Sequence, residues 1–205
     1  MTAPMNASAL PASVLLQAGA AAEPAARSTR EDEREALQAC RRGEREAFDL
    51  LVERYQRDVY RLCYRYLGNH EDANDMAQEA FLKAYRGLHS FRGDSAFSTW
   101  LYRIAVNACL NFRAARKPAE ELPEGLPDGR APASERLVLE EKQQRVRAAV
   151  GRLPEKQRAT LILKIYHDLT HEEVAKVLGS TVGTVKANLF HALGNLRKLV
   201  AETGD

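Results

Sequence analysis

The sequence predicts an all-α protein made of two small helical domains joined by a flexible linker. Two observations support this. Apolar residues recur at helical spacing over long stretches on both sides of residues 118–134. That segment itself contains four prolines and two glycines but few large apolar residues, so it cannot form a core and is expected to be a linker. The expected domains cover residues 31–117 and 135–205.

Residues 1–30 are expected to be a disordered extension, or the product of an over-long gene start, because they are rich in Ala and Pro and lack periodicity. An apolar patch at residues 10–22 has no preceding basic residue and is interrupted by Gln17. It is also too short to span a bilayer. Neither a signal sequence nor a membrane anchor is therefore expected.

Three helices are expected in the first domain before residue 90. The first runs over residues 31–42 and ends at Gly43, the second covers residues 44–67, and the third covers residues 71–86. Gly68 and Asn69 provide the stop signal between the second and third helices. These helices should pack with the next one as a compact bundle.

Residues 91–113 stand out as a possible nucleic-acid surface. A Gly-containing loop carries Phe91 and Phe97, which we expect to be exposed, and leads into a helix with an apolar stripe. The opposite face offers Arg103, Asn107 and Asn111 at about one-turn spacing, which suits base edges and phosphates. Aromatic loop residues beside amides could hold unstacked bases. The alternative interpretation is a solvated amphipathic helix.

The second domain has the pattern of a helix-turn-helix. A helical pattern from residue 135 reaches Leu153, and a further helix is expected over residues 154–166. Thr170 and Glu173 spell a capping box for a short helix that ends at Gly179. Ser180 or Thr181 can cap the last helix. Its expected buried stripe is Val185, Leu189, Ala192, Leu193, Leu196 and Leu199, and its outward positions are Thr184, Lys186, Asn188 and His191.

Residues 90–107, in particular Ser-Phe-Arg-Gly-Asp-Ser-Ala-Phe and Thr-Trp-Leu-Tyr-Arg-Ile-Ala-Val-Asn, closely resemble the promoter-recognition segment of extracytoplasmic-function (ECF) sigma factors, especially the sigma-E group. This resemblance implies that the first domain reads the −10 element and helps to open the DNA. The residues implied in DNA and single-strand contacts are Phe91, Phe97, Trp100, Arg103, Asn107, Asn111, Arg113, Arg116 and Lys117.

Residues 72–85 resemble the segment through which sigma factors dock on a coiled coil of the largest core-polymerase subunit. An acidic, amide-bearing helix face suits a basic partner helix and does not suit DNA. A solvated helix face is the alternative interpretation. The implied docking residues are Asp72, Asp75, Gln78, Glu79 and Lys83.

Residues 153–200 resemble the sigma domain that reads the −35 element, with Thr184, Lys186, Asn188 and His191 able to enter the major groove. Many relatives have arginines where this chain has Asn188, His191, Gly194 and Asn195. Because each lost phosphate contact lowers the salt slope of binding by roughly 0.9, we expect a weaker electrostatic grip and a different −35 sequence.

The resemblance also implies three partners: core RNA polymerase through its beta-prime and beta subunits, promoter DNA, and an anti-sigma factor that holds the protein inactive. It implies a cytoplasmic protein, which an anti-sigma factor anchored in the inner membrane could hold at that membrane. The acidic linker could mimic nucleic acid in polymerase channels or serve as a plain spacer. Two other classes remain open from the residues. They are a helix-turn-helix regulator that acts without polymerase, and a metal-dependent helical enzyme.

The net charge of +2 is too small to indicate DNA binding by itself. A DNA-binding role must therefore depend on local clusters of basic residues. Cys40, Cys63 and Cys109 form no metal or redox motif and are expected to be buried reduced thiols. His167 and His171 lack further ligands for a metal site. No cofactor is expected, and no catalytic motif is present, so the sequence does not predict an enzyme.

Overall fold

The computed structural model describes the backbone of residues 28–116 and 133–202, and the side chains of residues 31–116 and 142–202. Every regular element within these ranges is helical, which confirms the predicted fold class. The N-terminal extension up to residue 27, Lys117 and most of the predicted linker lie outside the described residues.

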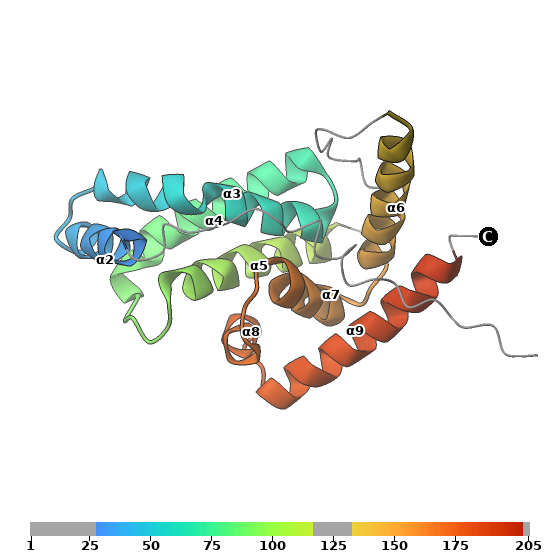
Figure 1. Ribbon diagram of the computed structural model, residues 1–205. Coiled ribbons are helices and arrows are strands. Elements are labelled where there is room, and N and C mark those ends of the chain that lie inside the picture. Colours follow the sequence, from blue (N-terminus) through green and yellow to red (C-terminus); the bar gives the residue numbers. More distant parts are fainter. Residues whose placement is uncertain (1–27, 117–132, 203–205) are drawn as a thin grey trace, which may run out of the picture.

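The first half of the described chain is a helical bundle in which α3, α4 and α5 pack against one another and α2 packs on α3 (Figure 1). Gly68 ends α3 in the left-handed conformation, with φ of 81°, and its amide donates to the Tyr64 carbonyl. Asn69 then begins α4 by accepting the amides of Glu71 and Asp72 at 2.8 and 3.1 Å. The elements are α2 (Ser28–Arg41), α3 (Ala47–Leu67), α4 (His70–Gly87), a short 3-10 turn η1 (Leu88–Ser90) and α5 (Phe97–Ala115).

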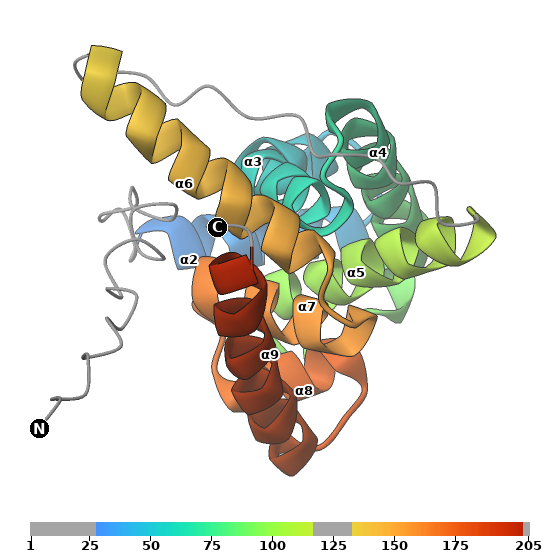
Figure 2. The ribbon, with the colours of Figure 1, turned by 90° about the vertical axis from the view of Figure 1, so that its right-hand side faces the viewer.

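The second half contains four α-helices and one π-helical segment among its described residues. They are α6 (Ala133–Gly151), α7 (Glu155–Leu161), η2 (Ile162–Tyr166), α8 (His171–Leu178) and α9 (Val182–Glu202). The helix predicted over residues 154–166 forms, but it changes from an α-helix to a π-helix after Leu161. Figure 2 shows α9 crossing next to α7 and α6, and these three helices share a small core of their own.

The two halves pack directly against each other: α5 lies beside α8 (Figure 1), and α3 contacts η2. One hydrophobic cluster runs through both, from Leu62 and Val106 in the first half to Ile162 and Val174 in the second. The Tyr102 ring lies 5.0 Å from the His167 ring at this junction. Burial of apolar surface therefore holds together two segments that are far apart in the sequence.

Arg158 is buried at the same junction and forms hydrogen bonds with both halves of the chain. Its side chain is 2% exposed, and its guanidinium donates to the carbonyls of Val150 and Leu153 at 3.0 Å and of Tyr66 at 3.3 Å. It also donates to the Gly151 carbonyl. Val150 and Gly151 end α6, and Tyr66 is in the last turn of α3, so one cation satisfies carbonyls at two helix ends.

Candidate nucleic-acid interface

An aromatic cluster supports the loop before α5. Phe91 is 7% exposed and Phe97 is 1% exposed, so the prediction that these side chains are exposed is wrong. Their ring centroids lie 5.7 Å apart, and both rings contact the half-buried Trp100, at 5.2 and 5.7 Å. Packing these rings against one another removes apolar surface from water and so stabilises the loop. This is the physical reason why the phenylalanines are buried and not exposed as predicted. In this conformation the two phenylalanine rings lie under the loop and support it.

Backbone contacts fix the position of this loop. Gly93 has φ of 84°, a conformation that side chains other than glycine rarely adopt. The Arg41 guanidinium in α2 donates to the Phe91 carbonyl at 2.6 Å. From α8, the Lys176 ammonium donates to the Asp94 carbonyl at 3.4 Å. The loop is therefore held from α2 on one side and from the second half of the chain on the other.

One edge of α5 is open to solvent and carries the predicted polar residues. Arg103, Asn107 and Asn111 are all exposed and follow one another at four-residue intervals, so they form one stripe along the helix. The opposite face is buried, with Leu101 and Ala105 fully enclosed. A guanidinium and two amides in line can serve both phosphates and base edges. Arg113, farther along the helix, is half-buried.

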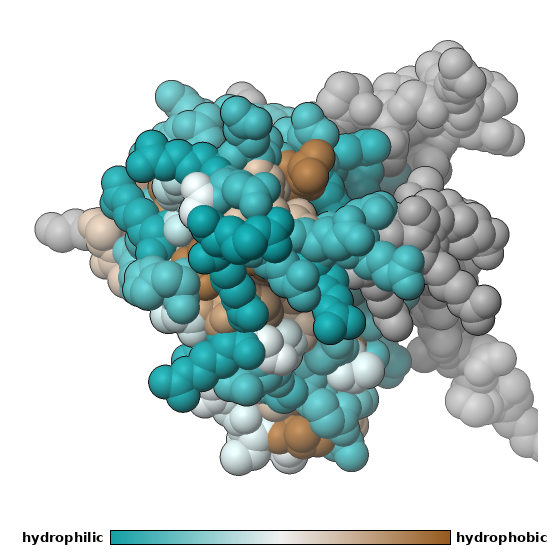
Figure 3. Space-filling view, turned by 90° about the vertical axis from the view of Figure 1, so that its left-hand side faces the viewer, coloured by the Kyte–Doolittle hydropathy of each residue, from teal (hydrophilic) through white to brown (hydrophobic). Residues whose placement is uncertain are grey.

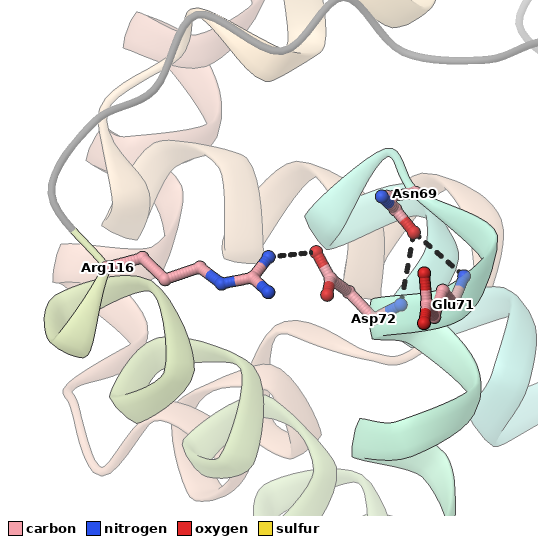
Figure 4. Close-up of polar contacts among 4 residues, drawn as sticks. All are labelled: Asn69, Glu71, Asp72 and Arg116. Atoms are coloured by element: carbon pink, nitrogen blue, oxygen red, sulfur yellow. Dashed lines mark hydrogen bonds and ion pairs between the residues drawn. The ribbon is translucent and has the colours of Figure 1, made fainter.

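Asp72 and Arg116 form an ion pair that the sequence did not indicate. Asp72 was predicted to face outward on α4, but it is buried, and its carboxylate accepts a hydrogen bond from Arg116 at 2.6 Å (Figure 4). The Arg116 guanidinium also lies 4.4 Å from the centre of the Phe112 ring. The prediction that Asp72 faces outward is therefore wrong. Arg116 remains 56% exposed and can reach solvent beyond this pair.

The rest of the predicted docking face of α4 is accessible. Asp75, Gln78 and Lys83 are exposed, and the half-buried Glu79 pairs with Lys83 at 2.5 Å. Sequence reasoning missed two apolar members of this surface, Leu82 at 55% exposure and Tyr85 at 42%. They follow Asp75 and Gln78 along one helix stripe, at positions where a bundle helix would normally be polar. Leu50 on the neighbouring α3 is also exposed.

The helix-turn-helix forms with the predicted caps. The Thr170 hydroxyl accepts the Glu173 amide while the Glu173 carboxylate accepts the Thr170 amide, which confirms the capping box. Gly179 ends α8 with φ of 58°. At the start of α9, the Thr181 hydroxyl accepts the Thr184 amide at 3.1 Å and lies 2.9 Å from the Thr184 hydroxyl. The hydroxyl of Thr184 is therefore engaged in the cap.

The outward face of α9 is more apolar than the sequence indicated. Lys186 and His191 are exposed, whereas Asn188 is half-buried. Leu193 was predicted to be buried but is 40% exposed, and Phe190, which no prediction singled out, is 75% exposed. A 100° step per residue places Phe190 off the buried stripe of its neighbour Leu189, which is the signal that could have identified it.

Burial suppresses ionisation of several side chains at the centre of the molecule. It lowers the pKa of His167 to about 4, and the nearby guanidinium groups of Arg65 and Arg61 act in the same direction. A hydrogen bond with Cys63, together with burial, raises the pKa of Cys109. Both cysteines are buried free thiols, and Cys40 is a half-buried one. None of these groups takes part in the solvent-facing stripes.

The end of the molecule that carries α2 and the α4–α5 loop has a mainly hydrophilic surface, with hydrophobic side chains in small separate patches (Figure 3). None of the helices in the described residues is long and apolar enough to cross a membrane.

A helix bundle with an exposed polar helix edge, followed by a capped helix-turn-helix, is typical of DNA-binding proteins. Residues 51–118 match the family described as Sigma-70 region 2, and residues 143–196 match the family described as Sigma-70, region 4. The sequence is similar to the RNA polymerase sigma-H factor of Pseudomonas aeruginosa, with 40% identity over 178 residues that cover 80% of this chain and 91% of the relative. It is also similar to the ECF RNA polymerase sigma-E factor of Escherichia coli, with 42% identity over 168 residues that cover 76% and 87%.

The chain therefore belongs to the ECF sigma factors of the sigma-70 family. Proteins of this family direct RNA polymerase in transcription initiation and are not themselves enzymes. This confirms the resemblance on which the functional expectations depend.

Solved structures support the same fold. CnrH, in complex with the cytosolic domain of CnrY, is similar with a TM-score of 0.65 and 24% identity, covering 83% of this chain and 98% of CnrH. The sigma factor RpoE of Bartonella quintana, in complex with the anti-sigma factor NepR, is similar with a TM-score of 0.63 and 20% identity, covering 75% and 96%.

Proposed function

We propose that this sigma factor divides its work among three exposed helix faces. The face of α4 docks on core RNA polymerase, the edge of α5 reads the −10 element and captures a separated strand, and α9 reads the −35 element. The observation that carries this proposal is the stripe of Arg103, Asn107 and Asn111, which is exposed along a helix whose other side is locked into the core. A rigid helix with an accessible polar edge is pre-organised for contact with DNA.

On α5, the amides of Asn107 and Asn111 are suited to base edges and Arg103 to phosphate. Arg113, Arg116 and Lys117 extend the basic character of the chain toward the end of this helix. Phe91, Phe97 and Trp100 act beneath this surface, where the aromatic cluster fixes the loop through which the strand would pass. An unstacked base would then be held mainly by amide hydrogen bonds.

On α4, the docking surface combines Asp75, Gln78, Glu79 and Lys83 with the exposed side chains of Leu82 and Tyr85. Stable protein interfaces have an apolar centre with an aromatic residue and a polar rim. This face has both components, and its acidic residues complement a basic helix of the largest polymerase subunit.

We also propose an anti-sigma partner and a cytoplasmic site of action for this chain. The support is by analogy, because CnrH and the Bartonella quintana RpoE were both solved in complexes, the second with an anti-sigma factor. The polymerase that a sigma factor must join is itself cytoplasmic.

Reconstitution with core polymerase tests the assignment of α5. Asn107→Ala should leave core binding intact and reduce the amount of open complex on a cognate promoter by about fivefold or more, because a good amide contact with a base is worth roughly 1–3 kcal/mol. Permanganate reactivity of unpaired thymines measures the opening, and gel filtration measures core binding. Gln56→Ala, which removes an exposed amide from α3, is the control and should behave as wild type.

Loss of core binding in Asn107→Ala would contradict the division of work among the helix faces. Binding of the isolated chain to its promoter as duplex, with no effect of added core polymerase, would instead indicate a regulator that acts without polymerase.

A further inference from the structure

The ion pair between Asp72 and Arg116 joins two helices to which the proposed function gives different tasks. Asp72 lies in the first turn of α4, the helix of the docking surface, and Arg116 directly follows the last residue of α5. The Arg116 guanidinium donates to the Asp72 carboxylate at 2.6 Å (Figure 4). The docking surface proposed above does not include Asp72, so this pair needs another explanation.

The Asp72 carboxylate is held in one position. The residue is 8% exposed, and its backbone amide donates to the Asn69 side chain at 3.1 Å, in the cap that begins α4. An acidic side chain in the first helical turn is also stabilised by the helix dipole. Because removing the counter-charge from a buried carboxylate is costly, Asp72 should retain Arg116 as its partner.

Arg116 is restrained by several contacts and still reaches solvent. Its backbone amide donates to the Phe112 carbonyl at 3.2 Å, and its guanidinium lies 4.4 Å from the centre of the Phe112 ring and contacts Asp72. The Arg116 side chain is nevertheless 56% exposed. A guanidinium has five N–H donors, so several remain for a second acceptor. An arginine held in this way can bind a phosphate without first losing the freedom of a long side chain.

The place of Arg116 in the chain indicates which acceptor it meets. It lies five residues, or roughly 7.5 Å in the direction of the helix axis, beyond Asn111, the last member of the exposed polar stripe of α5. Successive phosphates of one DNA strand are about 3.4 Å apart along the axis. A strand with a base at Asn111 therefore brings a phosphate close to Arg116 within about two nucleotides.

We propose that Asp72 is a positioning residue for promoter binding: it holds the Arg116 guanidinium in the orientation that contacts a phosphate of the −10 strand. This inference rests on the proposed reading of the −10 element by α5. Asp72 then belongs to the DNA side of the molecule, although its sequence segment resembles the polymerase-docking segment. It touches neither polymerase nor DNA and acts only through Arg116.

The first experiment separates the position of Arg116 from the charge of Asp72. Asp72→Asn and Asp72→Ala remove the same charge, but only asparagine keeps an oxygen that accepts a hydrogen bond from Arg116. The assay measures the affinity of reconstituted holoenzyme for a promoter fragment whose −10 strand is unpaired. Asp72→Ala should bind about two- to tenfold more weakly than Asp72→Asn, the range expected when one long side chain must be ordered on binding. In an Arg116→Ala background the two variants should bind equally.

The second experiment locates the phosphate. A neutral methylphosphonate replaces one phosphate of the unpaired strand at a time. Wild-type holoenzyme should lose affinity at the phosphate that Arg116 contacts, and Arg116→Ala should be insensitive to that replacement. Arg116→Ala should also lower the log–log salt slope of binding by about 0.7, the value for one phosphate contact on a single strand. Asp72→Asn should retain the loss at that phosphate, and Asp72→Ala should show a smaller one.

Glu71→Gln is the matched control, because it removes an exposed carboxylate from the same turn of α4 and should leave the DNA affinity unchanged. Core binding, measured by gel filtration, should be the same for wild type and both Asp72 variants. Circular dichroism checks that each variant is folded. If Asp72→Ala does not fold, Asp72→Ser takes its place, because a serine hydroxyl is one bond nearer the backbone and out of reach of Arg116.

The two proposals fail in different ways. If Arg116→Ala keeps the wild-type salt slope and the same sensitive phosphate, Arg116 does not contact the strand, and the proposed DNA contact at the end of α5 is wrong. If Arg116→Ala loses that contact but Asp72→Ala and Asp72→Asn bind DNA equally, the positioning role of Asp72 is refuted. Weaker core binding by both Asp72 variants with unchanged DNA affinity would also refute it and would place Asp72 in the docking surface.

Discussion

Replacing Arg158 by Ala tests whether this residue holds the junction between the two halves of the chain. The guanidinium is buried and donates to carbonyls at the end of α6 and in the last turn of α3. Alanine removes every one of these donors and leaves polar oxygens in a site that water reaches poorly. We therefore expect a large decrease in the free energy of unfolding when this one buried residue is replaced.

The magnitude follows from the hydrogen bonds. Bonds from a charged donor contribute roughly 1.5–3 kcal/mol each. Two of the four, to Val150 and Leu153, have lengths of 3.0 Å, and the bond to Tyr66 is longer at 3.3 Å. Counting only the bonds to Val150 and Leu153, each at the lower value, gives a loss of about 3 kcal/mol. With a denaturant slope of about 2 kcal/mol per molar, the urea midpoint should fall by about 1.5 M.

Urea unfolding followed by circular dichroism measures this change. Arg152→Ala is the control, because Arg152 is nearby but 60% exposed and its pair with Glu202 spans 3.6 Å. An exposed pair of this kind should contribute less than about 0.5 kcal/mol. A loss below about 1 kcal/mol in Arg158→Ala, or equal losses in the two variants, would refute the capping role of Arg158.

Three further predictions concern docking, pH and salt. The double variant Gln78→Ala with Glu79→Ala should bind core polymerase more weakly, because it removes two polar members of the docking face; fluorescence anisotropy measures the affinity. Because the folded state holds the pKa of His167 near 4, below its unfolded value near 6.5, the unfolded state takes up a proton first as the pH falls. Stability should therefore be complete above pH 6.5, and this ring should lower the free energy of unfolding by about 2 kcal/mol between pH 7 and 5. His191→Arg should steepen the dependence of promoter binding on salt by about 0.9 in the log–log slope, by adding a phosphate contact on α9.

Each of these predictions has its own control. The double variant Glu53→Ala with Gln56→Ala, at exposed positions of α3, should bind core polymerase normally, and equal affinities for all three proteins would remove α4 from the docking surface. His167→Gln should lose the pH dependence, and a variant that keeps it would assign the effect to another group. His191→Ala should keep the wild-type salt slope, and an unchanged slope in His191→Arg would place this residue away from phosphate.

Local signals predicted the helix ends accurately where a cap is built from neighbouring residues. Thr170 with Glu173, Gly179 and Thr181 all act as their residue types indicate. The apolar stripes also identified most of the core, since a 3.6-residue period depends only on the chain itself. The exposed stripe on α5 was predictable for the same reason.

Side chains whose environment comes from distant segments were predicted less well. Phe91 and Phe97 looked exposed because they lie in a polar loop, yet Trp100 and the underlying helices enclose them. Asp72 looked like part of an acidic face, yet Arg116, forty-four residues later, buries it in an ion pair. Leu193 matched the buried stripe of α9 but is 40% exposed in the folded protein.

The sequence by itself determined the helices, their caps and the family, because these depend on residues within a few positions of one another. Only the tertiary structure decided that the two halves share one hydrophobic cluster, that Arg158 caps two helix ends at once and that Phe190 is left uncovered. The physical reason is that burial and charge pairing depend on which surfaces meet in space. Segments as distant as α3 and α7 meet only after the chain has folded.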